Sequence, residues 1–225
     1  MIKIKNVVTP SPEQWKVLIL GARNAMNSWN KSDSNYSHDC FMIGPNDHDL
    51  MMRLRNAGTD HRKFMRMITV YVDITAPLYW WKEFDTYKVG TVTNSCSTMH
   101  KIADKPFSEG DISCDELMKG NLADIEGNIV APELKAHYKH MMNILSSLNN
   151  LRDLYLKTGN KRYWRCMIEM LPNSYNQKRT VMLNYEVLAN IYKSRKNHKL
   201  DEWVKFCEWI ETLPYHELIC GEDNK

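Results

Sequence analysis

The chain has 225 residues, enough for one domain with a sizeable core, and its 30 Lys and Arg against 27 Asp and Glu leave a net charge of +3. This balance argues against a dedicated nucleic-acid binder, and no run approaches the roughly 20 apolar residues that a membrane span needs. The six cysteines form no CxxC pair and Met1–Lys5 carries no secretory signal, so we expect reduced thiols in the cytoplasm.

The amino-terminal third predicts two strands and two helices. In chain order, we expect an edge strand over Ile2–Val8, a helix over Glu13–Trp29, a polar loop over Asn30–Gly44, a short helix over Asp47–Asn56 and a strand over Arg66–Ile74. The last of these is rich in β-branched and aromatic residues, which favour strands.

A proline marks the change from strand to helix in the middle of the chain. Ala76-Pro77 ends the strand, because proline cannot donate to a sheet ladder but fits the first turn of a helix. A helix over Leu78–Lys88 and a hydroxyl-rich segment over Thr91–His100 follow. Residues 104–131 combine glycine, proline and acidic residues, so we expect an irregular loop or lid over a site.

The carboxyl-terminal half predicts mainly helices. The longest is expected over Pro132–Tyr155, where apolar residues recur at helical spacing, and a second over Arg162–Met170 before a Leu-Pro stop. A short β-like run over Arg179–Leu183 precedes a helix that ends at Arg195, and a final helix is expected over Asp201–Leu213.

Polar residues recur along the helix that ends at Arg195. Asn184 and Asn190 lie six residues apart, and Arg195 lies five further on, so the three could border a groove. Two amides and a guanidinium suit a flat, hydrogen-bonding ligand such as a pyrimidine or an isoalloxazine ring. The spacing alone favours a helix cap followed by solvated polar residues over a binding site.

The order of these parts resembles the flavin-dependent thymidylate synthases. In that family an Ala-Pro-like turn precedes a helix ending in Arg-His-Arg-x-x-Ser, and an Asn-Glu-x-Ser-x-Arg-Tyr segment follows. A later Leu-Pro is followed twelve residues on by an asparagine and by an arginine at the end of the same helix. Here Pro172 and Asn184 are twelve residues apart, and Arg195 ends the helix.

Two further matches extend the resemblance toward the amino end. Ala22-Arg23 resembles the family's Ala-Ala-Arg helix, and Asp60-His61 lies where the family has Gly-His before its sheet. The resemblance therefore runs from about residue 15 to about residue 210, in the same order throughout.

The chain departs from the family at several phosphate-binding positions. The Arg-His-Arg motif falls on Thr86–Lys88, which leaves one cation of three, and its serine falls on Thr91. Of the next segment Asn94 and Ser97 survive, whereas the acid and the arginine do not.

Two arginines of the second half are also replaced. The family's arginine before Leu-Pro falls near Ile168, and the one after the helix asparagine falls near Glu186, a reversal of charge. A carboxylate beside a nucleotide phosphate is repulsive unless it is compensated, by about 1 kcal/mol at a few ångströms even in bulk water.

The resemblance implies an α+β fold with a small, mainly antiparallel sheet flanked by helices, in a single domain over residues 1–225. It implies a homotetramer with flavin sites between subunits, in which FAD accepts hydride from NADPH, methylenetetrahydrofolate supplies the carbon and dUMP is the acceptor. The protein then positions and polarises, because the cofactor carries the chemistry.

The same resemblance assigns roles to individual residues. His61, Asn184 and Asn190 would surround the flavin, and Lys88 would contact a phosphate. Thr91 and Arg195 would be catalytic, with Arg195 on a pyrimidine carbonyl. The nucleotide-binding residues would be Asn94, Ser97 and Arg195, with Thr91 and Ser97 on nucleotide oxygens.

Other functions stay open at this point. One alternative keeps the fold but acts on another pyrimidine nucleotide, as in base modification by a phage. Another is a non-catalytic nucleotide-binding, flavin-binding or structural descendant.

Other kinds of site have weaker support in the sequence. Metal sites at His38–Cys40, at Asp47–Asp49 or at the helical pair His137 and His140 lack a converging second pair of ligands. Cys96 has no nearby cation to lower the pKa of its thiol, as a cysteine nucleophile requires.

Tryptophans are more numerous than a small core needs, and aromatic residues are enriched in subunit interfaces. They therefore predict a homo-oligomer. The tryptophans in question are Trp80, Trp81, Trp164, Trp203 and Trp209.

Overall fold

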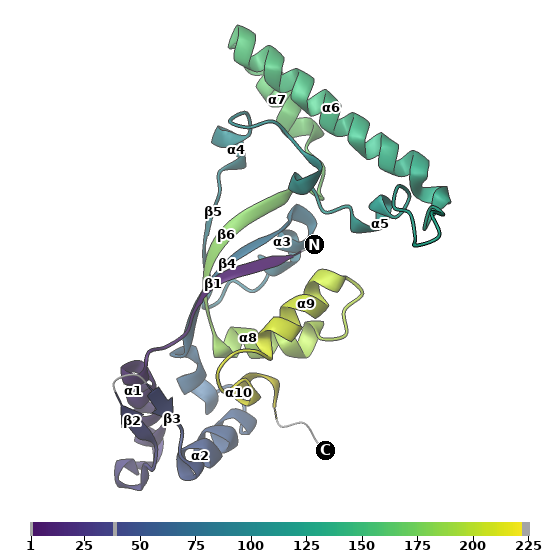
Figure 1. Cartoon of the computed structure of the whole chain (residues 1–225). Coiled ribbons are helices and arrows are strands. Elements are labelled where there is room, and N and C mark those ends of the chain that lie inside the picture. The colour runs from purple at the N-terminus through teal and green to yellow at the C-terminus, as the bar shows by residue number, and fades with distance from the viewer. Residues whose placement is uncertain (1, 38–39, 222–225) are drawn as a thin grey trace. The chain divides into compact units, whose positions relative to one another are not determined.

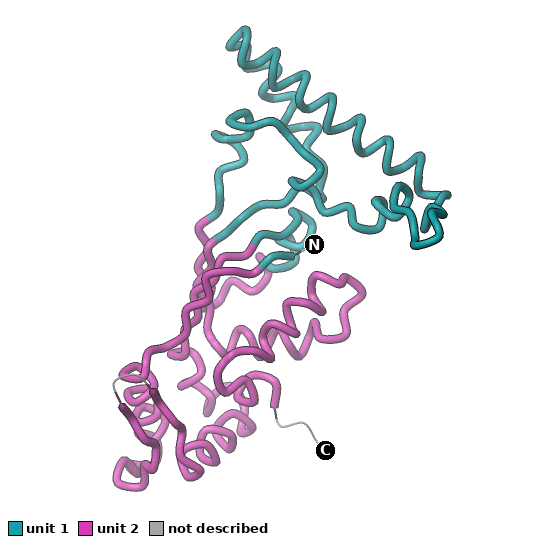
Figure 2. The backbone as a smooth tube through the Cα atoms, in the orientation of Figure 1, with its two compact units in different colours: residues 1–3, 75–84, 95–179 teal, residues 4–74, 85–94, 180–225 magenta. Residues whose placement is uncertain are grey.

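The computed structural model describes residues 2–37 and 40–221 (Figure 1). The chain divides into two compact units, each built from three segments (Figure 2). Unit 1 comprises residues 1–3, 75–84 and 95–179, and unit 2 comprises residues 4–74, 85–94 and 180–225. The expectation of a single domain stays a prediction, because units that interleave along the chain can belong to one cooperatively folding domain.

A four-stranded sheet has the order β1 (Lys3–Val8), β4 (Thr69–Pro77), β6 (Asn176–Asn184) and β5 (Val92–Ser95). The sheet is antiparallel, and β1 and β5 form its edges. This confirms the predicted α+β fold with a small antiparallel sheet. Each of the four strands has residues in both units.

Strand β4 shows why the sheet has one buried face. Val70, Val72 and Ile74 are almost completely buried, whereas Tyr71 between them is 48% exposed. Successive side chains of a strand point to opposite faces, so this alternation places the valines and the isoleucine in the core and the tyrosine outside it. On the exposed face Asp73 accepts a hydrogen bond of 2.6 Å from the hydroxyl of Thr180 on β6.

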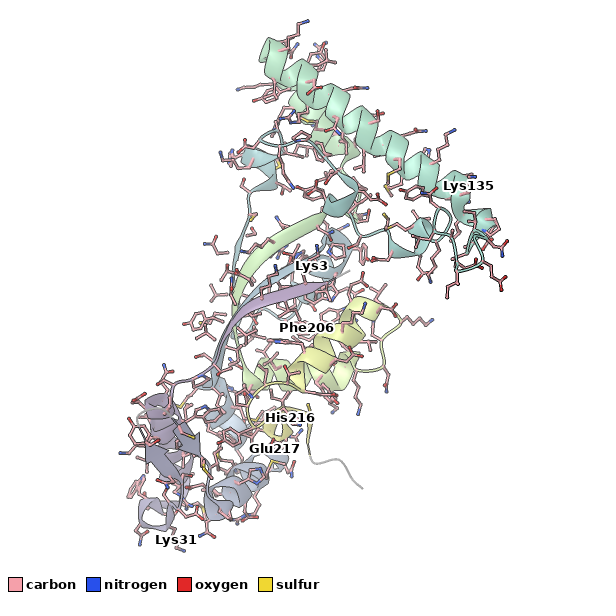
Figure 3. All side chains as sticks on the ribbon, in the orientation of Figure 1. Lys3, Lys31, Lys135, Phe206, His216 and Glu217 are labelled. Atoms are coloured by element: carbon pink, nitrogen blue, oxygen red, sulfur yellow. The ribbon has the colours of Figure 1, made fainter. Side chains whose placement is uncertain are left out.

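Unit 2 contains the helices and the small hairpin that lie near the two ends of the chain. Its helices are α1 (Pro12–Arg23), α2 (Pro45–Asn56), α8 (Tyr185–Arg195), α9 (Asp201–Ile210) and α10 (Glu217–Cys220), with a hairpin of β2 (Asn35–Ser37) and β3 (Cys40–Met42). Phe206 of α9, labelled in Figure 3, is fully buried. None of the helices within residues 2–37 and 40–221 is long and apolar enough to cross a membrane.

A buried ion pair ties α1 to α2. Arg23 donates from Nε to Asp47, and the second carboxylate oxygen of Asp47 accepts from the hydroxyls of Ser32 at 2.8 Å and Ser34 at 2.6 Å. Burial raises the pKa of Asp47, but these hydrogen bonds outweigh it and hold the pKa below its usual value. Arg23, which belongs to the Ala22-Arg23 pair that resembles a family motif, therefore has a structural role in this unit.

Unit 1 is built around a helical hairpin. Its helices are α3 (Leu78–Phe84), α4 (Thr98–Lys101), α5 (Asp115–Met118), α6 (Lys135–Thr158) and α7 (Lys161–Met170). Leu148 of α6 and Met167 of α7 are fully buried in its core, and Phe107 and Ile112 join them. The first part of segment 104–131 is thus fixed in the core, whereas Ile125 further along it is fully exposed. Its role as a lid stays a prediction.

Several element boundaries differ from those predicted. In the carboxyl-terminal half, α6 covers Lys135–Thr158 rather than Pro132–Tyr155, β6 begins at Asn176 rather than at Arg179, and α9 ends at Ile210 rather than at Leu213. Three further differences lie in the amino-terminal half. Helix α1 ends at Arg23 rather than at Trp29, and the chain continues as short 3-10 turns with Asn27 in the left-handed region at φ 45°. Strand β4 begins at Thr69, because Arg62–Arg66 form a 3-10 helix (η3). The third difference is at α3, which ends at Phe84 rather than at Lys88.

The predicted loop over Asn30–Gly44 contains the β2–β3 hairpin, in which Tyr36 lies opposite Phe41. Its strands have three residues each, too few to show an alternating pattern. The tryptophan argument for an oligomer also weakens, because Trp80, Trp81 and Trp203 are buried within the chain itself.

Candidate functional site

Strand β6 passes directly into α8, and Asn184 lies at the junction. Its side-chain oxygen accepts a hydrogen bond of 3.0 Å from the backbone N–H of Val187, which makes Asn184 the N-cap of α8. Its amide nitrogen donates to the carbonyl oxygen of Gly90 at 3.4 Å. Asn184 is 7% exposed, so its amide joins α8 to the segment before β5 rather than lying free on a groove wall.

That segment is a tight turn over residues 88–91. The N–H of Thr91 donates to the carbonyl of Lys88 at 3.3 Å, and Gly90 between them has φ 81°. A Cβ at Gly90 would lie 2.6 Å from the Asn184 amide nitrogen, so the turn requires glycine for both its conformation and its close approach.

The turn presents one exposed cation and one buried hydroxyl. Lys88 is exposed. The Thr91 hydroxyl is buried and has no hydrogen-bond partner among the described residues. An unsatisfied buried polar group costs about 1–3 kcal/mol, so this oxygen is suited to a partner that the chain does not supply.

Glu186 lies in the first turn of α8 between two arginines of η3. Its carboxylate pairs with Arg62 at 3.3 Å and with Arg66 through the other oxygen. Burial raises the pKa of Glu186, but Arg66 and then Arg62 outweigh it and hold the pKa below its usual value. The charge reversal seen in the sequence is therefore compensated, and the cluster of Arg62, Arg66 and Glu186 has a net charge of +1.

Asn190 lies at the same cluster, and His61 precedes Arg62 in the chain. The side-chain oxygen of Asn190 accepts from Arg62 Nη2 at 3.3 Å, four residues along α8 from Glu186 and hence on the same helix face. His61 is exposed and immediately precedes η3. The structure thus brings Asn190 to Arg62, a partner that the sequence interpretation missed. The signal was available in the spacing of Arg62 and Arg66, which lie four residues apart in a basic run.

Arg195 at the end of α8 is held by aromatic side chains. Its Nε donates to the Tyr87 hydroxyl at 3.0 Å, and its guanidinium lies 4.8 Å from the ring centroid of Trp203. A further contact of 2.9 Å joins Nη1 to His198 Nε2. Tyr87 is one of the positions that depart from the family's Arg-His-Arg motif, so this replacement gives Arg195 a new partner.

The polar residues of α8 are spread along the helix. Asn184 and Arg195 lie at its two ends, roughly 16 Å apart at 1.5 Å per residue. They cannot both contact one small ring. An elongated ligand such as a dinucleotide is long enough to reach both ends.

The two remaining candidates lie on β5 and α4. Asn94 is exposed on β5, whose four residues are all exposed. Ser97 belongs to unit 1 and caps α4 by accepting a hydrogen bond of 3.0 Å from the N–H of His100. The other candidate residues, Asn94 included, belong to unit 2.

Three cavities among the described residues of unit 2 lie away from the candidate residues. One of about 330 Å³ is lined by side chains of α1 and of the segment before β4, among them Val17, Leu18 and Met67.

Within residues 2–37 and 40–221, no group of three or more His, Cys, Asp or Glu is placed to hold a metal ion. His38 and Asp39 lie outside the described residues. Cys96 is exposed, and burial raises the pKa of the Cys207 thiol to about 12.

Comparisons with known proteins rest on structure alone. No protein-family model matches the chain, and no curated protein sequence does. Among solved structures, the thymidylate synthase ThyX from Helicobacter pylori with FAD and dUMP is 17% identical, with a TM-score of 0.63 over 99% of this chain and 97% of that one. A second structure of that enzyme, also complexed with FAD and dUMP, gives 17% identity and a TM-score of 0.62 over 99% and 98%.

A third solved structure belongs to a different enzyme. The UMP/dUMP methylase PolB from Streptomyces cacaoi, bound with 5-Br dUMP, is 12% identical, with a TM-score of 0.63 over 97% of this chain and 93% of that one. At such identities the likeness establishes the fold, and the chain has the fold of ThyX. The resemblance predicted from the sequence is confirmed at this level.

Proposed function

We propose that the chain is a nucleotide methylase of the ThyX type that binds FAD and a pyrimidine nucleotide, with reductive methylation of dUMP as its reaction. The observation that supports this most is the match, over nearly the full length of both chains, to structures that contain FAD and dUMP. Methylenetetrahydrofolate would supply the carbon and NADPH the hydride. When bound, FAD supplies the redox chemistry of such a reaction.

The residues of unit 2 fit an anionic, elongated ligand of this kind. Lys88 and the Arg62–Arg66 pair supply cations on one unit, and the net charge of +1 that the pair keeps beside Glu186 offsets one of the two cations lost at Thr86 and Tyr87. Guanidinium groups favour phosphates because their fork of donors matches phosphate oxygens. We assign Lys88, with Arg62 and Arg66, to the phosphates of the cofactor.

The remaining candidates take the roles that the resemblance implies. His61, Asn184 and Asn190 would surround the flavin, Asn184 chiefly by fixing the turn through its bond to Gly90. Arg195 would donate to a pyrimidine carbonyl, oriented by Tyr87. The unpaired hydroxyl of Thr91 would donate to a ligand oxygen, and Asn94 and Ser97 would contact the nucleotide.

A second candidate function is methylation of a different pyrimidine nucleotide, as in base modification by a phage. The chain is as similar in fold to the UMP/dUMP methylase as to ThyX, with a TM-score of 0.63 to each. A change of nucleotide would affect Tyr87 first, because Tyr87 orients the Arg195 that is assigned to the pyrimidine carbonyl. We also propose a homotetramer with the flavin sites between subunits, on the resemblance alone.

Rescue of a thymidine auxotroph and an assay of the purified protein test the proposal together. With FAD, NADPH, methylenetetrahydrofolate and dUMP, we expect thymidylate to form, and we expect expression of the chain to support growth without thymidine. Methylation of UMP but not of dUMP would favour the second candidate. Protein that binds FAD and dUMP but turns over neither dUMP nor UMP would indicate a non-catalytic descendant and contradict both enzyme proposals.

A further inference from the structure

Unit 1 contains a cavity of about 500 Å³ that none of the candidate residues lines. It lies between α4, α6 and α7. The side chains that matter for its chemistry are Met99, His100, Arg152, Tyr155, Lys161 and Trp164. The cavity therefore combines aromatic, aliphatic and cationic groups within one unit.

The turn between α6 and α7 creates this cavity. Gly159 follows α6 in the left-handed region at φ 66°, and its N–H donates to the Tyr155 carbonyl at 2.8 Å. Asn160 then caps α7 by accepting from the N–H of Arg162 at 3.0 Å. The chain reverses within two residues, so Lys161 at the start of α7 and Tyr155 in the last turn of α6 line the same cavity.

Trp164 connects α7 to α4 across the cavity. Its indole N–H donates to the Met99 carbonyl at 2.9 Å, and its ring is partly exposed. On α6, Arg152 is held by a bond from Nε to the Ala103 carbonyl at 2.9 Å and by an ion pair from Nη1 to Asp153 at 3.2 Å. These bonds fix an aromatic ring and a guanidinium in place before any ligand arrives, which lowers the entropy cost of binding.

The first turn of α7, which borders the cavity, carries positive charge that is unusual for the start of a helix. Helix amino ends favour acids, yet α7 has no acid in its first turn and begins with Lys161 and Arg162. Within the described residues no carboxylate lies within ion-pair distance of Lys161. The acid that lines the cavity, Asp104, pairs with Lys101 at 3.0 Å. An anion at this position would relieve the repulsion between Lys161 and the positive amino end of the α7 dipole.

The apolar lining indicates what else the ligand carries. Met99 is 47% exposed and Leu156 57% exposed, and both line the cavity with Tyr155 and Trp164. Aromatic side chains pack against planar rings in offset or edge-to-face contact. Pockets for small molecules combine such apolar walls with a few fixed polar groups.

We infer that this cavity binds a small aromatic anion, a ring that carries a phosphate or a carboxylate. The ring would lie against Trp164 and Tyr155, and the anion would lie at Lys161 and the amino end of α7, with Arg152 and His100 as further donors. The site goes beyond the proposed function, because its residues lie outside the set assigned to FAD and the pyrimidine nucleotide.

Calorimetric titration of the full chain with phenyl phosphate tests this inference. We expect saturable binding, at least about tenfold tighter than that of phenol or of inorganic phosphate, because each of these carries only half of the ligand. Lys161→Gln should weaken binding about tenfold, the loss of one charge-assisted hydrogen bond. Benzoate and UMP, titrated in parallel, distinguish a carboxylate from a nucleotide as the preferred form.

Matched variants locate the binding. Arg165→Gln removes the same charge from the same helix at an exposed position, where Arg165 pairs with Glu169 at 2.9 Å, and should leave affinity unchanged. Arg195→Lys in unit 2 should also leave it unchanged. Trp164→Phe keeps a ring and should retain most of the binding, whereas Trp164→Leu should lose it.

Three results would overturn the inference. One is no heat of binding for phenyl phosphate at millimolar concentration. The second is equal affinity for Lys161→Gln and Arg165→Gln. The third is a loss caused by Arg195→Lys, which would place the probe at the proposed nucleotide site instead. Because none of these outcomes depends on FAD, failure here is distinguishable from failure of the proposed function.

Discussion

Replacing Glu186 by glutamine removes the carboxylate that holds Arg62 and Arg66 while keeping the shape of the side chain. Glu186 is 7% exposed and paired with both arginines. Breaking a fully buried ion pair costs about 3–5 kcal/mol, but both arginines keep contact with solvent. We therefore expect a loss of about 2 kcal/mol in the free energy of unfolding, or a fall in Tm of about 4–8 °C for a chain of this size.

The decrease of the free energy of unfolding at low pH gives an independent readout of the same variant. The pKa of Glu186 lies below its ordinary value, so the folded chain binds fewer protons there than the unfolded chain. The contribution of Glu186 to the free energy of unfolding is complete above the ordinary glutamate pKa, and it is lost as the pH falls through the lower pKa that Glu186 has in the folded chain. In Glu186→Gln the free energy of unfolding should therefore depend less on pH in this range. The remaining acid dependence comes from groups such as Asp47 and Asp111, whose pKa values are also lowered.

Thermal and urea unfolding at pH 7 and across the acid range measure both effects. Glu208→Gln, an exposed position on α9, is the matched control and should shift Tm very little. The freed arginines should bind an anion no less tightly than before, so FAD affinity should not fall. Equal stability of the two variants would refute the reasoning, since Glu186 would then behave as a surface charge.

Arg195→Lys should weaken dUMP binding about ten- to a hundredfold, because lysine cannot reproduce the guanidinium fork. It should also lower Tm through the lost bond to Tyr87, and a lowered Tm with unchanged dUMP affinity would make Arg195 a purely structural residue. Gly90→Ala should lower the free energy of unfolding by more than the about 1–2 kcal/mol of left-handed strain, because the new methyl meets the Asn184 amide. Gly127→Ala, also at positive φ but in open space, should show the strain alone in urea titrations, and equal losses would contradict the predicted clash. Light scattering at micromolar concentration should return a tetramer mass, and a monomer would remove the shared flavin site.

Periodicity explains why most elements were predictable. The β-branched and aromatic residues of Arg66–Ile74 predict the strand observed as β4, and the helical spacing before Leu-Pro predicts α7 one residue from its observed start. Because the order of such elements survives extensive substitution, a resemblance could be stated at 17% identity. The helix-cap alternative for Asn184 was also among the predictions, and the structure shows that cap.

Ion pairs between residues that lie far apart in the sequence could not be predicted. Arg62 and Glu186 are separated by 124 residues, and only the packing of η3 against α8 shows that the reversed charge at Glu186 is compensated. Composition likewise could not distinguish a core tryptophan from an interface one, and Trp80 and Trp203 proved to be core. The burial of the Thr91 hydroxyl depends on the same tertiary arrangement.

Titration of the purified chain with FAD, followed by quenching of flavin fluorescence, tests the proposed flavin and nucleotide site most directly. We expect saturable binding, strengthened by dUMP and weakened about tenfold or more when Arg62 and Arg66 are both replaced by glutamine. Protein that stays colourless and leaves flavin fluorescence unchanged at high FAD concentration, with or without dUMP, would contradict the account.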